Sequence, residues 1–378
     1  MSIIKSVTTL TTSVPLPAPV GFSSRTVTRR EYTLVRITTE QGVSGIGFCY
    51  PGHAAAELST IAVRDLLGPL LVGEDCADIE RLWNRMYQEA LLHGRTGSVM
   101  RALSAIDIAL WDAKAREAGL PLHKLLGGHA DRVPAYASGG YYLDGKGPDG
   151  LARELAGYVE AGFTAVKMKI GRLDHRGELD RLAAAREAVG PDTLLMLDAN
   201  NAFSDLPTAL RAVRAWERFD PYFVEEPFSP DDITNHARLA ARVDVPIATG
   251  EIEAGRWRTR ELLEQGGAII LQQDAAVCGG ISELQKIAHT ASSYGVTLCP
   301  HWFHDVHAPV AGAFSNVRFV EYFPHNDVFN FGDLVDRQLV VDGGELVLHD
   351  APGLGFSFEE DAVARFAHTD WTAAELRD

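Results

Sequence analysis

The sequence lacks the features that mark secreted, membrane-spanning and metal-thiolate proteins. Its four cysteines are scattered without a CxxC pair, which excludes a disulfide framework or a zinc site and favours a reducing compartment. No run of residues approaches the roughly 18 apolar positions of a membrane span. The amino-terminal residues also lack the apolar block of a signal peptide. We therefore expect a cytoplasmic protein with no membrane partner.

Positive charge is also scarce. The chain of 378 residues has 35 lysines and arginines against 51 aspartates and glutamates, which gives a formal net charge of −16. Nucleic acids and anionic membranes need a basic surface, so neither is an expected partner. An anionic small molecule must instead be held by local cations.

The chain divides into parts with different patterns. Residues 1–128 begin with β-rich segments and continue with three helical patterns, which predicts an α+β domain. Residues 129–325 alternate eight short apolar strand candidates with seven helix-like segments, which predicts an α/β fold of the (β/α) barrel type. A doubly wound open sheet is the alternative. Residues 326–378 form a partly β-like tail that we expect to return to the first domain.

Ionisable residues follow the strand candidates at intervals of 20 to 29 residues. In a barrel, the carboxyl ends of the strands converge on one mouth, where active sites lie. The residues expected to meet there are Lys167, Lys169, Asp198, Glu225, Glu251, Asp274, His301 and Glu321. A series in this register indicates one functional site rather than separate structural salt bridges.

Three of these residues form a candidate metal site. Asp198, Glu225 and Glu251 end consecutive strands and offer only oxygen ligands, which favours a hard divalent cation such as Mg²⁺. Glu226 is expected to be a supporting partner or exposed. Asn200 follows Asp198 at a spacing of two, so it faces the same way and is a candidate for orienting a ligand or substrate.

Lys167 and Lys169 share one face of a strand that otherwise looks buried. An edge strand with a solvated face is the structural alternative. In a catalytic site, repulsion between two ammonium groups lowers the pKa of one of them, which makes it usable as a base at neutral pH. Lys169, nearer the end of the strand, is the better candidate base.

Asp274 and His301 lie on adjacent strand candidates. A carboxylate bonded to one imidazole nitrogen fixes the tautomer and favours the imidazolium, so the other nitrogen can exchange protons with a substrate. His304 and His307 fall in the following loop or helix and have no predicted role. Lys169 and His301 are expected to flank the substrate on opposite faces.

Taken together, these residues resemble those of the enolase superfamily, mandelate racemase subgroup. The resemblance covers essentially the whole chain and includes the KxK strand, "DAN", "EEP", Glu251, "QQDAAVCGGISE", His301, Glu321 and the helix "SAIDIALWDAKAREAGLPLHKLLGG". It implies a capping domain, completed by the carboxyl-terminal segment, over a modified (β/α)₇β TIM barrel. It also implies Mg²⁺ held by Asp198, Glu225 and Glu251, abstraction of the proton α to a carboxylate to give an enediolate, and a protonated Glu321 that donates to the enolate oxygen.

The loops expected over the barrel mouth bear on the fate of the enediolate. They offer polar side chains, namely Ser23, Ser24, Arg25, Tyr50, His53, His93 and Arg95. Such loops favour a hydroxylated substrate over an aromatic one, and we take Arg25, Tyr50, His53 and Asn200 as candidate substrate-binding residues. The prediction is an acid-sugar dehydratase, in which a β-hydroxyl leaves as water.

Several alternatives remain open from the sequence. A racemase or epimerase of a 2-hydroxy acid and a sugar-lactone cycloisomerase begin with the same proton abstraction. A non-catalytic sugar-acid-binding protein on this fold conflicts with the full set of catalytic residue types. An NAD-dependent oxidoreductase is disfavoured because the glycine-rich "GVSGIGF" runs into strand-like sequence, not into a helix. We also expect a homo-oligomer.

Overall fold

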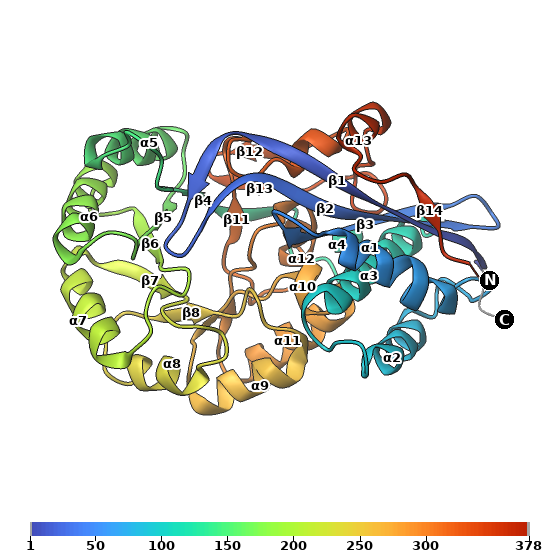
Figure 1. The fold of residues 1–378 in the computed structure, drawn as a ribbon, viewed down its shortest axis with the longest axis horizontal. Coiled ribbons are helices and arrows are strands. Elements are labelled where there is room, and N and C mark those ends of the chain that lie inside the picture. Colours follow the sequence, from blue (N-terminus) through green and yellow to red (C-terminus); the bar gives the residue numbers. More distant parts are fainter. Residues whose placement is uncertain (1, 376–378) are drawn as a thin grey trace.

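The computed structural model describes residues 2–375 and places a capping domain beside a barrel (Figure 1). The capping domain has three long strands followed by helices: β1 (Ile4–Gly21), β2 (Thr26–Thr39), β3 (Ser44–Gly52), α1 (Glu57–Ile61), α2 (Ile79–Ala90), α3 (Gly97–Glu117) and α4 (Leu122–Leu125). Helix α1 continues as a wider π-helical turn over Ala62–Leu67 and a 3₁₀ turn over Gly68–Leu70. The predicted order of strands first and helices after is confirmed.

Helix α3 packs directly on the sheet of the capping domain. Its backbone approaches β3 so closely that a Cβ at Gly45 would lie 2.2 Å from the carbonyl oxygen of Ala109, and one at Gly47 would lie 1.9 Å from that of Ala105. Only glycine fits at such a close approach of two backbones. The sequence "GVSGIGF" therefore serves helix packing and not phosphate binding.

Eight parallel strands form the barrel: β4 (Arg132–Gly139), β5 (Ala165–Lys169), β6 (Leu194–Asp198), β7 (Pro221–Glu225), β8 (Ile247–Thr249), β9 (Ile270–Leu271), β10 (Thr297–Leu298) and β11 (Val320–Tyr322). Each of β4 to β9 pairs with its successor in the chain, and β11 pairs with β4. A parallel bridge between Leu298 and Val317 closes the ring. This closure confirms the barrel and excludes the open sheet.

Seven helical segments connect the strands and cover the barrel: α5 (Pro148–Glu160), α6 (His175–Val189), α7 (Leu206–Trp216), α8 (Ile233–Ala240), α9 (Gly255–Gln265), the pair α10 (Ala275–Cys278) and α11 (Gly280–Ser293), and α12 (His304–Ala311). A 3₁₀ turn over Glu217–Phe219 follows α7. Aspartates cap four of these helices by accepting a backbone N–H of the first turn: Asp174 for α6, Asp205 for α7, Asp232 for α8 and Asp274 for α10.

The tail differs in part from its prediction. Strands β12 (Val340–Asp342) and β13 (Glu345–Val347) form a hairpin that pairs antiparallel with β4 of the barrel instead of returning to the capping domain. A 3₁₀ turn over Phe331–Leu334 precedes the hairpin. After it, α13 (Glu360–Phe366) and β14 (Thr372–Ala373) reach the capping domain, where β14 becomes the edge strand beside β1. The local apolar pattern identifies the hairpin as β, but it does not indicate which domain the hairpin joins.

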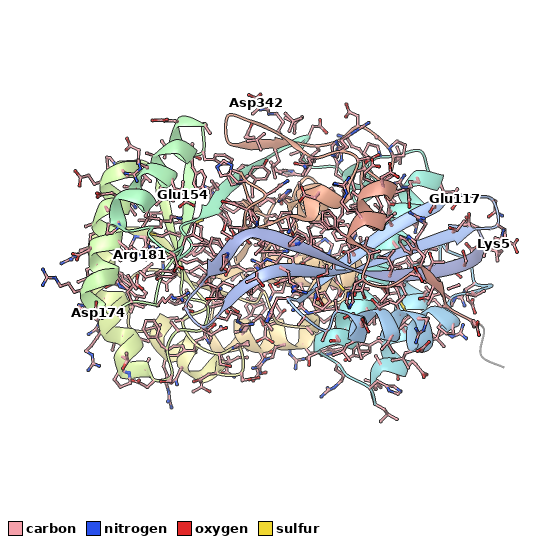
Figure 2. All side chains as sticks on the ribbon, turned by 45° about the horizontal axis from the view of Figure 1, so that its top comes forward. Lys5, Glu117, Glu154, Asp174, Arg181 and Asp342 are labelled. Carbon is pink, nitrogen blue, oxygen red and sulfur yellow. The ribbon has the colours of Figure 1, made fainter. Side chains whose placement is uncertain are left out.

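The loop between β1 and β2 extends across the barrel mouth (Figure 1). Gly21 pairs with Tyr142 of the barrel in a backbone bridge, and the Ser23 hydroxyl donates to the carbonyl oxygen of Asn200 at 2.8 Å. In the side-chain view, Lys5 and Glu117 lie toward one end of the molecule and Asp174 at the other (Figure 2). Because the β1–β2 loop makes these two contacts at Gly21 and Ser23, the capping domain contributes one wall to whatever the barrel mouth binds.

A buried carboxylate joins the two domains. Asp107 of α3 accepts the backbone N–H of Ser282 at 2.9 Å and the Ser282 hydroxyl at 2.6 Å, at the start of α11. Burial raises the pKa of Asp107 to about 7, although the bonds from Ser282 act in the opposite direction. The folded protein therefore keeps this proton up to about neutral pH.

This proton makes stability depend on pH. Between the ordinary aspartate pKa of about 3.9 and the folded value of about 7, the folded state binds more protons than the unfolded state, so stability falls as pH rises. The effect is at most about 1.4 kcal/mol per pH unit. We expect the melting temperature of the Asp107→Asn variant minus that of the native protein to increase from pH 5 to pH 8. A constant difference between them would contradict the raised pKa.

The four cysteines are unpaired and buried, as the absence of a disulfide pattern predicts: Cys49, Cys76, Cys278 and Cys299. Burial raises the pKa of the Cys49 thiol to about 12, so it is not a reactive thiolate. Across residues 2–375, no helix combines the length and the apolar character needed to cross a membrane.

Candidate active site

The barrel strands place the predicted site residues by simple alternation. An apolar layer fills the barrel interior, with Tyr136, Ala165, Met196, Phe223, Ala248, Ile270, Cys299 and Phe319. Because side chains two residues apart share a face, the next inward positions lie nearer the mouth. On five strands these positions are occupied by Lys167, Asp198, Glu225, His301 and Glu321. The lysine pair thus faces a buried interior, and the exposed edge-strand alternative is wrong.

Glu251 and Asp274 reach the mouth by other means. Gly250 has a φ of 123°, and a Cβ there would lie 2.5 Å from Nε2 of Gln273, so the chain turns at a residue that only glycine can occupy. This turn carries Glu251 to the mouth. Asp274 lies beyond β9 at the start of α10, where its Oδ1 accepts the N–H of Ala276 at 2.7 Å.

The predicted metal ligands come together. One carboxylate oxygen from each of Asp198, Glu225 and Glu251 lies within 4.8 Å of the others, and all three side chains are buried. Oε2 of Glu251 has no hydrogen-bond partner among the described residues. Burial, together with the charges of Glu226, Glu225 and Asp198, raises the pKa of Glu251 well above its usual value. An all-oxygen donor set with excess negative charge fits a hard divalent cation such as Mg²⁺.

The two lysines are bonded to these carboxylates. Nζ of Lys167 lies 2.8 Å from an oxygen of Glu225 and 2.8 Å from one of Glu321, and Nζ of Lys169 donates to Asp198. Burial is the largest effect and lowers the pKa of Lys169, as does repulsion from Lys167. The combined attraction of Asp198, Tyr141 and Glu225 outweighs both, so the net pKa is raised. The predicted repulsion from Lys167 does lower the pKa of Lys169, but it is smaller than the attraction to Asp198, so the net direction is opposite to the prediction. Lys169 can act as a base only when another cation shares the charge of Asp198.

The expected proton on Glu321 is also wrong in this arrangement. Burial raises the pKa of Glu321, but the charges of Lys167 and His301 oppose it and hold that pKa at about 2. Oε2 of Glu321 accepts the backbone N–H of Trp302 at 2.7 Å. Glu321 is therefore a carboxylate that accepts hydrogen bonds.

Asp274 and His301 form a hydrogen-bonded pair. Oδ2 of Asp274 lies 3.1 Å from Nδ1 of His301, and Nε2 of His301 faces Oε1 of Glu251 at 3.6 Å. The backbone N–H of Ala275 donates to Nε2 of His307 at 2.9 Å, which anchors the residue next to Asp274. Burial lowers the pKa of His307 to about 4, so it is a neutral acceptor. His307, which had no predicted role, thus helps to hold the backbone next to Asp274 in place.

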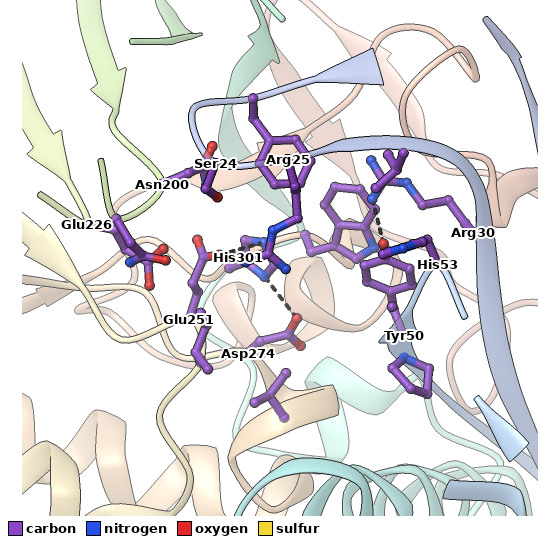
Figure 3. Close-up of a pocket in the computed structure, with 18 of the residues that line it drawn as sticks. Ser24, Arg25, Arg30, Tyr50, His53, Asn200, Glu226, Glu251, Asp274 and His301 are labelled. Carbon is purple, nitrogen blue, oxygen red and sulfur yellow. Dashed lines mark hydrogen bonds and ion pairs between the residues drawn. The ribbon is translucent and has the colours of Figure 1, made fainter. Parts of the chain in front are cut away.

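These groups surround a cavity of about 160 Å³ beneath the capping domain (Figure 3). The candidate substrate-binding residues Arg25, Tyr50, His53 and Asn200 all line it, as do Ser24, Lys169, Glu251, Asp274 and His301. In the described chain, His93 and Arg95 do not line the cavity, so their predicted place over the mouth is wrong. The 92–97 loop leads into α3, which packs on β3 and on the barrel helices α10 and α11.

Two arginines that line the cavity were not predicted from the sequence, and Glu226 was predicted only in part. Arg30 and Arg101 come from the middle of regular elements of the capping domain, where no loop signal marks them. Glu226 is buried and lines the cavity, and neither carboxylate oxygen has a hydrogen-bond partner among residues 2–375. The exposed position that was one alternative for Glu226 is therefore wrong. The only feature of the sequence that could have indicated a place for Glu226 in the site is its position next to Glu225 in "EEP".

Backbone conformation also sets this cavity apart. Six residues other than glycine have positive φ in the described chain, and four of them line the cavity: Asn200, Asn201, Glu226 and Trp302. Each such residue costs on the order of 1–3 kcal/mol and persists only where its surroundings enforce it. Their concentration at one place is typical of a functional site.

Two family models match the chain. The model described as "Mandelate racemase / muconate lactonizing enzyme, N-terminal domain" matches residues 4–127, and the one described as "Enolase C-terminal domain-like" matches residues 150–362. Together they cover most of the capping domain and the barrel from residue 150 onward.

Several characterised proteins are similar over most of their length. Arabinonate dehydratase of Saccharolobus solfataricus is 35% identical over 343 residues, which cover 89% of this chain and 90% of that protein. L-talarate/galactarate dehydratase of Salmonella typhimurium is 35% identical over 357 residues, with coverages of 92% and 87%. 3,6-anhydro-alpha-L-galactonate cycloisomerase of Streptomyces coelicolor is 33% identical over 356 residues, with coverages of 94% and 96%.

A solved structure agrees with this relationship. The crystal structure of L-talarate/galactarate dehydratase from Salmonella typhimurium LT2, liganded with Mg and L-lyxarohydroxamate, superposes with a TM-score of 0.91 at 32% identity. The match covers 99% of this chain and 95% of that one. The fold thus has an experimental counterpart, and that counterpart contains bound Mg.

Proposed function

The chain belongs to the mandelate racemase/muconate lactonizing enzyme family of the enolase superfamily, and on that premise we propose that it is a Mg²⁺-dependent acid-sugar dehydratase. The observation that carries the proposal is the meeting of three elements at one cavity: the carboxylate triad, Lys169, and the Asp274–His301 pair. The polar side chains of Arg25, Tyr50 and His53 suit a substrate with hydroxyl groups.

Asp198, Glu225 and Glu251 hold the metal in this proposal. Bound Mg²⁺ supplies Lewis-acid polarisation of the substrate carboxylate, which makes the α-proton more acidic. The three oxygens within 4.8 Å of one another leave positions for water or substrate, as Mg²⁺ prefers. Lys167, bridged between Glu225 and Glu321, orients the ligand carboxylates and adds positive charge near the substrate carboxylate.

The proton transfers are divided between two residues. Nζ of Lys169 takes the α-proton, and the electron pair of the C–H bond passes into the enediolate. His301 then gives the proton on Nε2 to the β-hydroxyl, which leaves as water while the enediolate forms the carbon–carbon double bond. The resulting enol takes a proton at the β-carbon and becomes a 2-keto-3-deoxy acid. Asp274 accepts the bond from Nδ1 of His301 and favours the protonated ring.

The sugar-lactone cycloisomerase is a second candidate, because a relative of similar identity is named as a galactarolactone cycloisomerase. It shares the first proton transfer but eliminates a ring oxygen instead of a hydroxyl. Racemisation, in which His301 returns the proton to the α-carbon, uses the same residues.

One screen separates these reactions. The purified protein is incubated with acid sugars and their lactones in deuterated buffer, with Mg²⁺ and with excess EDTA. We expect a 2-keto product from an open-chain acid sugar with Mg²⁺, and none with EDTA. Inversion at the α-carbon without a 2-keto product would indicate a racemase. Turnover of lactones alone would indicate a cycloisomerase.

A further inference from the structure

The capping side of the cavity carries positive charge that the protein does not neutralise. Arg25, Arg30 and Arg101 line it, and within residues 2–375 none of the three forms an ion pair with a carboxylate. Other arginines of the capping domain do form such pairs, for example Arg36 with Glu360 and Arg116 with Asp112. These three arginines thus bring uncompensated charge to the wall of the cavity.

Arg30 is the most constrained of the three. It is 2% exposed, its Nε donates to the carbonyl oxygen of Val328 at 3.2 Å, and its Nη1 donates to the Tyr50 hydroxyl at 2.6 Å. Its guanidinium lies over the ring of Trp302, 4.6 Å from the centroid. These contacts fix the plane of the group but bring no negative charge to it. A buried guanidinium without a counter-ion is costly, so an anion from outside the chain is expected beside it.

The charged ends of the cavity are well separated. Figure 3 shows Glu226, Glu251 and Asn200 on one side, Arg30 and Tyr50 on the other, and His301 between them. A substrate whose reacting carboxylate lies at the metal ligands and whose β-hydroxyl lies at His301 extends toward the arginines. The far end of an acid sugar therefore meets a cationic wall.

Building on the proposed function, we infer that Arg30, with Arg25 and Arg101, binds a second carboxylate at the far end of the substrate. The enzyme is then selective for aldaric acids, which carry a carboxylate at both ends, over aldonic acids, which end in a CH₂OH group. Guanidinium groups pair with carboxylates through two parallel hydrogen bonds, whereas a terminal hydroxyl takes only one and leaves the charge unpaired.

Matched substrate pairs test this inference without any mutation. Each pair consists of a six-carbon aldaric acid and the aldonic acid of the same stereochemistry, so the two differ only at the terminal carbon. We expect kcat/KM for the aldaric acid to exceed that for its aldonic partner by on the order of 10- to 100-fold, the typical effect of a hydrogen bond to a charged group. Equal or better use of the aldonic acids overturns the inference.

Binding is measured separately from turnover. Titration calorimetry in Mg²⁺ compares the dissociation constants of the same pairs, and tighter binding of the aldaric acid supports the inference even where no 2-keto product forms. Absence of product from every acid sugar would contradict the dehydratase, while equal binding of the two acids would contradict the arginine site. The two failures are thus distinguishable.

Variants of the three arginines test whether these residues cause the preference for aldaric over aldonic acids. Arg30→Gln is expected to reduce kcat/KM for the aldaric acid by the same 10- to 100-fold, so that the ratio of aldaric to aldonic kcat/KM falls toward one. Because Arg30 is buried, Arg101→Gln and Arg25→Gln, at more exposed sites, repeat the test if that variant does not fold. The matched control is Arg29→Gln, an exposed neighbour on β2 that does not line the cavity. An undiminished preference in all three cavity variants overturns the assignment.

Discussion

Replacing His301 by asparagine is expected to lower 2-keto product formation by about 10²- to 10⁴-fold, the usual contribution of a general acid. Asparagine is too short to place a donor where Nε2 lies, and it cannot carry a titrating proton. Lys169 remains, so the α-proton of the substrate should still exchange slowly with deuterated solvent. Product formation measured by a keto-acid assay, and exchange measured by NMR, report the two steps separately.

The reciprocal variant completes this test. Lys169→Met should abolish both exchange and product, because no α-proton is removed in the dehydration direction. Asp274→Asn should cause a smaller loss than His301→Asn, since it withdraws only the 3.1 Å bond that supports the imidazolium. His129→Asn, at an exposed histidine outside the cavity, is the control. Near-normal product formation by the His301→Asn protein contradicts the assignment of the acid, whichever residue acts as base.

Replacing Glu251 by glutamine is expected to weaken Mg²⁺ binding and to reduce turnover by more than about 100-fold, the upper range for residues that merely support a metal ligand. The substitution keeps the shape of the side chain and removes a charge that lies among other carboxylates. In EDTA, the variant should therefore melt at a higher temperature than the native protein, because a neutral side chain avoids the burial cost and the repulsion that raise the pKa of Glu251.

Addition of Mg²⁺ should reverse that order. A ligand that binds only the folded state stabilises it in proportion to the logarithm of its concentration over Kd, so the native protein should gain stability and the variant little. Glu264→Gln, an exposed change on α9, should behave as the native protein does. Equal Mg²⁺-dependent shifts in native and Glu251→Gln proteins would remove Glu251 from the metal site.

The parts of the site that the sequence predicts well are those set by strand alternation. Lys167, Asp198 and Glu225 each follow an apolar inward residue by two positions, so their common direction can be read from the sequence. Glu251 breaks that rule because of the turn at Gly250. Its place was nonetheless predictable from the spacing of the βα units, since a glycine turn changes direction without changing the repeat.

Charge states and domain contacts were less predictable, for physical reasons. The pKa values of Lys169 and Glu321 depend on which of several buried partners is closest, and sequence spacing does not give that distance. Arg30 lies within a regular strand, and its role follows only from the absence of a carboxylate beside it among the described residues. A local β pattern predicts that the β12–β13 segment forms strands. It does not predict that the hairpin pairs with β4, because the pairing partner lies far away in the sequence.

The pairing of β1 with β14 has a consequence for the order of folding. The backbone N–H of Thr11 donates to the Thr369 hydroxyl across a sequence separation of 358 residues, and Thr8 and Thr9 pair with Ala373 and Thr372. Until that late segment has been synthesised, β1 presents an unpaired edge, which is a template for aggregation. Contacts of such long range also form slowly, because the loop must close before they contribute. The sheet of the capping domain can thus be completed only after the whole barrel has been synthesised.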